Sequence, residues 1–319
     1  KRDQVQKDAQ AELDEIMKKA EKFQRDVDKL QKSLANKKGD FKTMEQIQQL
    51  QQDQQSLQEQ LENVQEQLSE SMEEKNQLSE VDEELLKQQE MIEELMKEVM
   101  DDELKKLLDE LEKLLQNNQQ NELKEESEEL DQSSEEMKKQ LDRTMEMLKR
   151  LQVNEKIDDI EKELDQLAEE QKELKEDIQE NKLSKEEGLK KQDEIDKKFD
   201  ELKEDMKELK ELNEDLQKPM ELGDFQEQQD AIDQEMKEAS EQLQKEKKSK
   251  AGENQQKASD GMKQLSDQLN NAQEQSNKKQ NEEDMGLLRI LLENLMALSF
   301  DQESNLQAFA DVRDTDPAY

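Results

Sequence analysis

The chain has 319 residues, of which 43% are charged, 29% hydrophobic and 2% aromatic, and its formal net charge is -39. A two-domain globular enzyme would need roughly 45–50% apolar residues, so this composition excludes an ordinary enzyme core. The chain has no His, Cys or Trp, which also excludes His/Cys zinc sites, thiol nucleophiles, Ser-His-Asp triads and haem ligation by His or Cys.

Two classes of protein share this composition. Leu, Ile, Val and Phe make up about 20% of the chain, which is the boundary for intrinsic disorder at high net charge. Ala, Glu, Lys, Leu and Arg make up about half, which is typical of long helices and coiled coils. The spacing of the apolar residues therefore has to decide between them.

The first half of the chain has helical spacing. Residues 1–38 form an expected N-terminal helix, which the run Asn36-Lys37-Lys38-Gly39-Asp40 would end because Gly and Asn stop helices. A heptad row begins at Leu50 and continues at every seventh residue to Val99, with Ser71 as its one polar member. This row predicts long coiled-coil helices over residues 41–183, running without a break from 41 to 116.

Later registers are out of phase with this row. A broad leucine stripe covers residues 104–115, a second register covers 123–151, and a third covers 157–178 with Gln171 as its interruption. Each shift of phase indicates a stutter or a turn. The polar run 116–121 lies between the first two, so a turn is expected near 117–121. The seam positions also include methionines such as Met96, Met137 and Met206, which we interpret as helix packing.

Residues that typically start or end helices divide the second half of the chain into segments. Ser184 and Glu187 form a capping box, which predicts a helix over 184–218. Pro219 and Gly223 end it, and Asp224 can cap the next helix. Mildly basic helical segments are expected over 224–281, with breaks at Gly252 and at residues 275–281.

Charge is unevenly distributed. Acidic residues outnumber lysines strongly between Glu59 and Met100, whereas lysines outnumber acids between Lys245 and Gln280. Segments of opposite sign can pair across antiparallel helices. Alternatively, both stretches are simply solvated helix faces.

No residue pattern points to catalysis, to a cofactor or to a metal ion. Carboxylates recur at helical spacing throughout, but acid–base chemistry or metal binding needs them in a low-dielectric pocket or converging on an ion. The glycines are scattered singly, so there is no phosphate-binding loop. We therefore expect a non-enzymatic protein without catalytic, cofactor-binding or metal-binding residues.

Residues 282–319 contain the densest apolar run of the chain, followed by a C-terminal tail. Arg289, Glu293 and Asn294 interrupt the run, so it does not span a membrane. A helix lying on a membrane surface usually has a Lys/Arg-rich polar face, which is missing here. We predict a docking helix that packs on other helices of the same chain or on a partner protein. Its predicted contact residues are Met285, Leu288, Leu291, Leu292, Leu295, Leu298, Phe300, Leu306 and Phe309.

The same region carries a family resemblance. Its sequence is EEDMGLLRILLENLMALSFDQE over residues 282–303 and DPAY over 316–319, preceded by KPMEL at 218–222. It resembles a family of large bacterial proteins of unknown function, with membrane-spanning helices near the N-terminus followed by a long Gln/Glu/Lys-rich helical region. The resemblance implies a helical protein linked to the cell envelope. Because the chain starts at Lys1 without Met or a signal segment, we expect an internal piece anchored through segments outside it.

These observations predict an all-α chain, folded as an elongated coiled coil or an antiparallel bundle of long helices. The expected function is that of a spacer and scaffold, with other proteins or further copies of the chain as helix-docking partners. Nucleic acid is excluded as a partner by the net charge of -39. The alternative is the rod of a nucleotide-driven chromosome-organising or motor machine, whose ATPase head lies outside the chain. A membrane segment upstream would favour the first function, and a Gly-rich phosphate loop the second.

Overall fold

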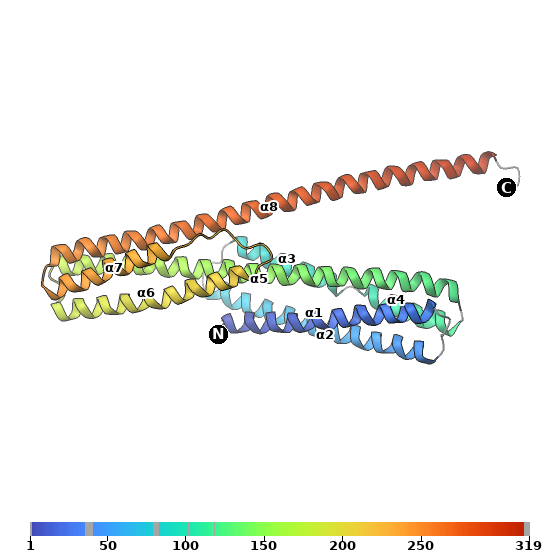
Figure 1. The fold of residues 1–319 in the computed structure, drawn as a ribbon, viewed down its shortest axis with the longest axis horizontal. Helices are drawn as coiled ribbons and strands as arrows, with labels where there is room; N and C mark the ends of the chain where they lie inside the picture. Colours follow the sequence, from blue (N-terminus) through green and yellow to red (C-terminus); the bar gives the residue numbers. More distant parts are fainter. Residues whose placement is uncertain (1, 36–40, 79–82, 101, 118, 316–319) are drawn as a thin grey trace. The chain divides into compact units, whose positions relative to one another are not determined.

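The computed structural model describes residues 2–35, 41–78, 83–100, 102–117 and 119–315. Every regular element in these ranges is an α-helix, which confirms the predicted all-α class (Figure 1). The helices are α1 (Arg2–Ala35), α2 (Phe41–Leu78), α3 (Glu83–Val99), α4 (Glu103–Gln116), α5 (Gln120–Gln179), α6 (Lys185–Glu214), α7 (Gln226–Gln244) and α8 (Lys248–Thr315).

The chain divides into two compact units. Unit 1 consists of Lys1–Asp159 and Glu204–Pro219, and unit 2 consists of Ile160–Lys203 and Met220–Tyr319. Helices α5 and α6 contribute one part of their length to each unit.

Unit 1 is built from antiparallel helices. Lys19 and Lys22 of α1 reach Gln60 and Asp53 of α2, so the residue numbers run in opposite directions along the pair. Helices α3 and α4 run antiparallel to α2 and pack against it. Gln51 Nε2 of α2 donates a hydrogen bond to Asp109 Oδ1 of α4 over 2.9 Å. Helix α5 closes the bundle, because hydrogen bonds join it both to α1 and to α3.

The core of unit 1 contains members of the predicted heptad row together with a stripe of apolar residues on α1. Phe23 and Val27 of α1, Ile47 of α2 and Ile92 of α3 have at most 1% of their surface exposed. They belong to one continuous cluster that extends along α1 to α5 as far as Leu151. One narrow apolar stripe per helix is therefore enough to fill this core.

The unbroken helix expected from 41 to 116 is wrong. Helix α2 ends at Leu78 and α3 begins at Glu83, and residues 79–82 between them lie outside the described part. A second break separates α3 from α4, where Asp102 is the N-cap and Glu103 lies in the first turn of α4. Acidic residues favour the start of a helix because they interact well with its dipole, and this start coincides with the shift of register after Val99.

The turn expected near 117–121 is confirmed, because α4 ends at Gln116 and α5 begins at Gln120. The later change of register, between Leu151 and Ile157, lies inside α5, which continues for 60 residues. Both residues are buried, so the phase shift is a stutter within one helix.

Unit 2 is a second antiparallel arrangement of four helices. Ser259 Oγ of α8 donates to the carbonyl oxygen of Ala168 in α5 over 2.7 Å, and Lys257 of α8 pairs with Glu235 of α7. Helix α6 lies against α5, where Lys198 pairs with Glu170. Lys257 and Lys263 of the mildly basic stretch thus meet glutamates of neighbouring helices within this unit, and Lys279 meets Glu221 in the connection between α6 and α7.

Two predicted helix ends in unit 2 are confirmed. The Ser184 amide donates to Glu187 Oε2 over 2.9 Å while the Glu187 amide donates to Ser184 Oγ over 3.2 Å, which is the predicted capping box. Gly223 has a φ of +84°, and Asp224 Oδ1 accepts a hydrogen bond from the Gln226 amide at the start of α7.

Two other predicted boundaries are wrong. Helix α6 ends at Glu214 instead of 218, although Leu216 beyond its end is still buried. Helix α8 starts at Lys248, so Gly252, the run 275–281 and the apolar residues after 282 all belong to one continuous helix. The break that ends α7 lies at residues 245–247 instead, where Glu246 has a φ of +58°.

Gly252 and Gly261 of α8 allow close packing instead of ending a helix. A Cβ atom added at Gly261 would lie 2.9 Å from Ile232 Cγ1 of α7, and one added at Gly252 would lie 2.7 Å from the Gln179 side-chain nitrogen. The gap at Gly261 is the more restrictive, because the branched Ile232 side chain has few alternative rotamers.

A layer of three glutamines crosses the core of unit 2. Gln171 of α5, Gln192 of α6 and Gln255 of α8 are fully buried. Gln171 and Gln192 exchange hydrogen bonds of 2.8 and 2.9 Å, and Gln255 Nε2 donates to Gln192 Oε1 over 3.0 Å. Because a one-turn slip of any helix would separate these amides, the layer fixes the register of the three helices.

We predict that Gly261→Ala destabilises unit 2 by about 1 kcal/mol, because overpacking against Ile232 costs more than the gain in helix propensity. The matched control is Gly188→Ala, where the added Cβ would lie 3.4 Å from Ile178 Cδ1, an ordinary contact. This control should stabilise the protein by about 0.5–1 kcal/mol. Urea unfolding followed by circular dichroism measures both, and equal stabilisation by the two variants would contradict the packing role.

We predict that Gln192→Leu lowers the free energy of unfolding by about 1–3 kcal/mol, because it leaves the Gln171 and Gln255 amides without this hydrogen-bond partner in the core. Replacing all three glutamines by Leu should restore the stability but broaden the amide spectrum measured by NMR, since the helices then lose their unique register. A triple variant with sharp signals and unchanged contacts would show that the layer has no role in register.

Candidate interaction surface on helix α8

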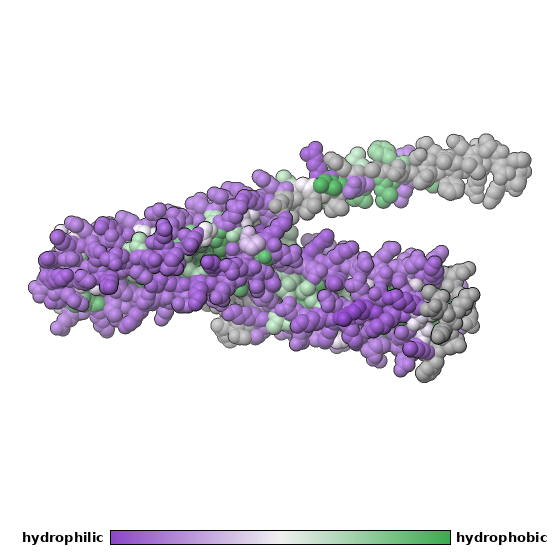
Figure 2. All heavy atoms as spheres, viewed as in Figure 1, coloured by the Kyte–Doolittle hydropathy of each residue, from purple (hydrophilic) through white to green (hydrophobic). Residues whose placement is uncertain are grey.

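The C-terminal part of α8 exposes a row of apolar side chains. We call residues 285–309 the apolar segment. Nine of its described apolar side chains have between 53% and 70% of their surface exposed. They are Met285, Leu288, Ile290, Leu292, Leu295, Met296, Leu298, Phe300 and Leu306. Figure 2 shows hydrophobic residues gathered on this part of the helix.

Most of the predicted docking residues belong to this exposed set. The exceptions are Leu291 and Phe309, whose side chains lie outside the described residues. Burial of the segment by the chain's own helices is therefore not observed for the described side chains, and docking on another molecule remains a prediction. Ile290 and Met296, which the docking prediction did not include, are also more than half exposed.

The apolar segment does not continue the buried stripe of α8. Leu265 and Leu269 are fully buried in unit 2, whereas Leu292 and Leu295 are more than half exposed. At roughly 100° per residue, the mean directions of these two pairs differ by roughly 130° around the helix. The helix therefore has two separate apolar faces, and only the first is covered within unit 2.

A network of charges joins α1, α5 and α6 in unit 1. Lys156 Nζ lies 2.8 Å from Glu208 Oε2, and Lys7 Nζ lies 2.8 Å from Glu208 Oε1. Hydrogen bonds from Lys156 and Lys7 lower the pKa of Glu208 to about 2. Burial alone would lower the pKa of Lys156, but its bonds to Asp205 and Glu208 outweigh this effect and raise it. Each charge has a partner of opposite sign, as is typical of a structural ion-pair network.

A carboxylate pair joins α4 and α5. Burial, a hydrogen bond with Glu110 and the negative charges of Glu110 and Glu129 raise the pKa of Glu126 to about 7. Glu126 and Glu110 therefore share a proton below neutral pH and repel each other above it. The pair is a pH-dependent link between two helices, with no third acid that would complete a metal site among the described residues.

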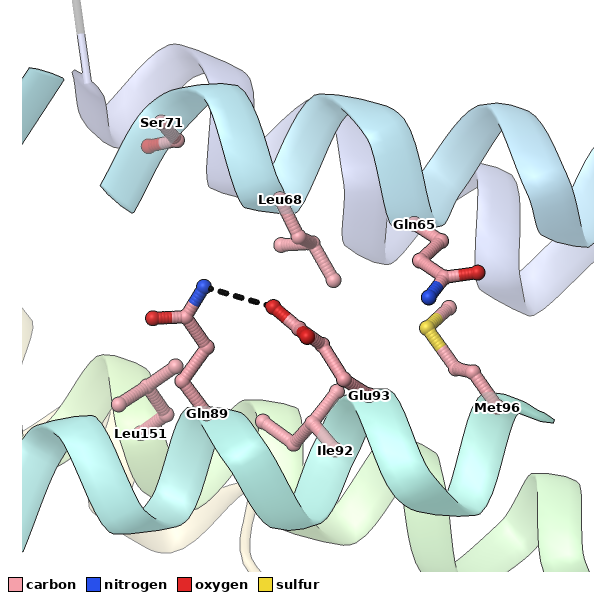
Figure 3. Close-up of a pocket in the computed structure, with 8 residues that line it drawn as sticks. All are labelled: Gln65, Leu68, Ser71, Gln89, Ile92, Glu93, Met96 and Leu151. Carbon is pink, nitrogen blue, oxygen red and sulfur yellow. Dashed lines mark hydrogen bonds between the residues drawn. The ribbon is translucent and has the colours of Figure 1, made fainter. Parts of the chain in front are cut away.

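The cavities are unlike substrate pockets. A cavity of about 10 Å³ lies between α2, α3 and α5 (Figure 3). Four apolar residues, Leu68, Ile92, Met96 and Leu151, and four polar residues line it. This volume holds about one water molecule. A larger hollow of about 510 Å³ lies between α2 and α4, but its lining consists of glutamines, acids and Lys105. Small-molecule sites are mostly apolar with a few converging polar groups, and this lining differs from that pattern.

Within the described residues, no helix is long and apolar enough to cross a lipid bilayer. In comparisons with protein-family models, with curated proteins and with solved structures, nothing matches this chain. The exposed apolar segment is thus the feature that most clearly requires a functional explanation, because a contiguous apolar patch on a soluble helix marks an interaction site.

We predict that Glu126→Gln stabilises the protein by about 1 kcal/mol at pH 8 and has little effect at pH 4.5. The folded-state pKa of Glu126, about 7, is above the ordinary glutamate value of 4.5. The folded state therefore binds more protons between these values, and stability falls as pH rises through this window. Urea unfolding at both pH values measures the difference, with Glu125→Gln, an exposed neighbour, as the control. A similar stabilisation at both pH values would contradict the shared proton.

Proposed function

We propose that the chain is a non-enzymatic spacer and interaction platform within a membrane-anchored protein of the bacterial cell envelope. The exposed apolar segment of α8 carries this proposal, because it is an apolar surface without a cover in a chain with a net charge of -39. The partner is another protein surface that buries this helix face.

The helices provide the rigid reach that a spacer requires. Helix α8 has 68 residues, which corresponds to about 100 Å at 1.5 Å per residue. Its first part is held in unit 2 by hydrogen bonds to α5 and α7, such as the bond between Asn254 and Glu238. A helix fixed in this way presents its distal part at a defined distance from its base.

The envelope location rests on the family resemblance of the C-terminal residues. The anchor would be supplied by segments outside these 319 residues, on a side of the membrane that the resemblance does not specify. The alternative function, the rod of a nucleotide-driven machine, would use the same antiparallel helices and differs in the domain to which they are attached.

We predict that the native full-length protein sediments with membranes, resists extraction by high salt and alkaline washes, and is released by detergent. Deletion of residues 282–309 should leave this behaviour unchanged, because the anchor lies elsewhere, but should abolish the complexes detected after chemical cross-linking. The matched control is the full-length protein with Asn294→Asp, a change on the same helix beside the apolar residues.

Recovery of the native protein in the soluble fraction without detergent would contradict the envelope proposal. Specific labelling of the same polypeptide by a photoreactive ATP analogue would instead support the nucleotide-driven machine. Cross-linked complexes that persist after the deletion would contradict the role of the apolar segment in docking.

A further inference from the structure

The strongest row of the apolar segment has heptad spacing. We call this row the α8 seam; it consists of Met285, Leu288, Leu292, Leu295, Ser299, Gln302, Leu306 and Phe309. Successive members are separated alternately by three and four residues, which places them along one side of a helix. The described apolar members are exposed over more than half of their surface. Such a row fits against a second helix with the same spacing.

We propose that the α8 seam pairs in parallel and in register with the α8 seam of a second copy of this chain. This inference rests on the proposed function, for which it names the partner. The pairing joins two copies through the distal part of α8 and leaves the buried stripe of each unit 2 unchanged, because the seam lies on a different face.

The exposed apolar area is sufficient for a stable interface. Complete burial of one such side chain removes on the order of 100 Å² of apolar surface. The seven described apolar side chains on or beside the seam, which leave out Ile290 and Phe300, therefore expose roughly 400 Å² together. A standard interface buries about 800 Å² per partner, of which roughly 60% is apolar. Met296 and Leu298 flank the seam and add to its contact area at the positions next to the partner helix.

In a pair of two copies, each polar residue of the seam can face the same residue of the other copy. In a parallel pair in register, Gln302 faces Gln302 and Ser299 faces Ser299. Two facing glutamines satisfy each other, because each amide has a donor and an acceptor. Unit 2 contains this arrangement already, where Gln171 and Gln192 exchange hydrogen bonds of 2.8 and 2.9 Å inside the core.

The parallel orientation buries more of the seam than the antiparallel one. An antiparallel pair that matches Ser299 with Gln302 would leave Met285 and Leu288 beyond the end of the partner's seam. An antiparallel pair that overlaps the whole seam would instead place Leu292 opposite Gln302 and Leu295 opposite Ser299. In both cases two apolar members lose an apolar partner. The parallel pair places every apolar member opposite an identical apolar residue.

The charge of the segment determines how this pairing responds to salt. Residues 282–303 contain one basic residue, Arg289, and these acids: Glu282, Glu283, Asp284, Glu293, Asp301 and Glu303. Two copies therefore repel each other along the flanks while their seams attract. Added salt screens this repulsion, so pairing with a second copy becomes tighter, whereas binding to a basic protein would become weaker. Anionic lipid would also repel these acids.

The first test measures the mass of the 319-residue chain by sedimentation equilibrium over a range of protein concentrations. We expect a monomer–dimer equilibrium whose dissociation constant falls between 0.05 and 0.5 M salt. Leu295→Asp should raise the dissociation constant at least about 100-fold, because both copies lose a buried leucine and gain a charge. Asn294→Asp adds the same charge one residue away, and should raise it by less than about tenfold.

The second test determines the orientation. The chain contains no natural cysteine, so single-cysteine variants report on one position each. Leu295→Cys should form a disulfide between two copies under mild oxidation, because in a parallel pair position 295 lies opposite itself. Asn294→Cys, on the side of the helix away from the partner, should cross-link at least about tenfold more slowly.

A chain that stays monomeric up to about 100 µM, or equal effects of Leu295→Asp and Asn294→Asp, would overturn the proposal. Cross-linking of Leu295→Cys to a Leu306→Cys copy in preference to itself would overturn the parallel orientation. A monomeric chain would leave the envelope spacer standing, because membrane sedimentation of the native protein tests that function separately.

Discussion

The scarcity of apolar side chains is the constraint on which this structure depends. With 29% hydrophobic residues, a helix of this chain can bury one narrow stripe and must leave the rest in water. Antiparallel bundles satisfy this condition, because each helix meets its neighbours along that stripe. The same scarcity explains why the hollow between α2 and α4 has a polar lining.

Narrow apolar stripes hold helices together but specify their register poorly, since a slip by one heptad replaces leucine with leucine. The polar residues inside the cores fix the register of the helices. Gln171, Gln192 and Gln255 form such a layer in unit 2, and Asn154 donates to Gln88 in the buried part of unit 1 over 2.9 Å. A slipped register would leave these amides buried without partners, which costs more than the slip gains.

Spacing predicted the helices well, and local chemistry set their ends. The buried stripe of α5, from Leu123 to Ile178, and the Ser184 capping box could be found from the sequence. The shift of phase after Val99 indicated a stutter or a turn, and the structure shows that it is a break between two helices. Gly252 was taken for a helix break, because a glycine that admits a neighbouring helix looks in sequence like one that ends its own. The seven described docking residues were found as an apolar run, but their exposure depends on where the bundle ends, which no local pattern encodes.

The negative charge of the chain limits how the apolar segment can associate with other molecules. A chain with a net charge of -39 is protected from non-specific association over most of its surface, since any approach between two copies brings acids together. An exposed row of leucines would otherwise be an aggregation hazard. With the exposed Glu282 and Glu303 on the same helix, the row is accessible mainly to a partner that aligns with it along the helix. Repulsion along the flanks and attraction in the seam together favour one geometry of contact, which is what a spacer that joins defined partners requires.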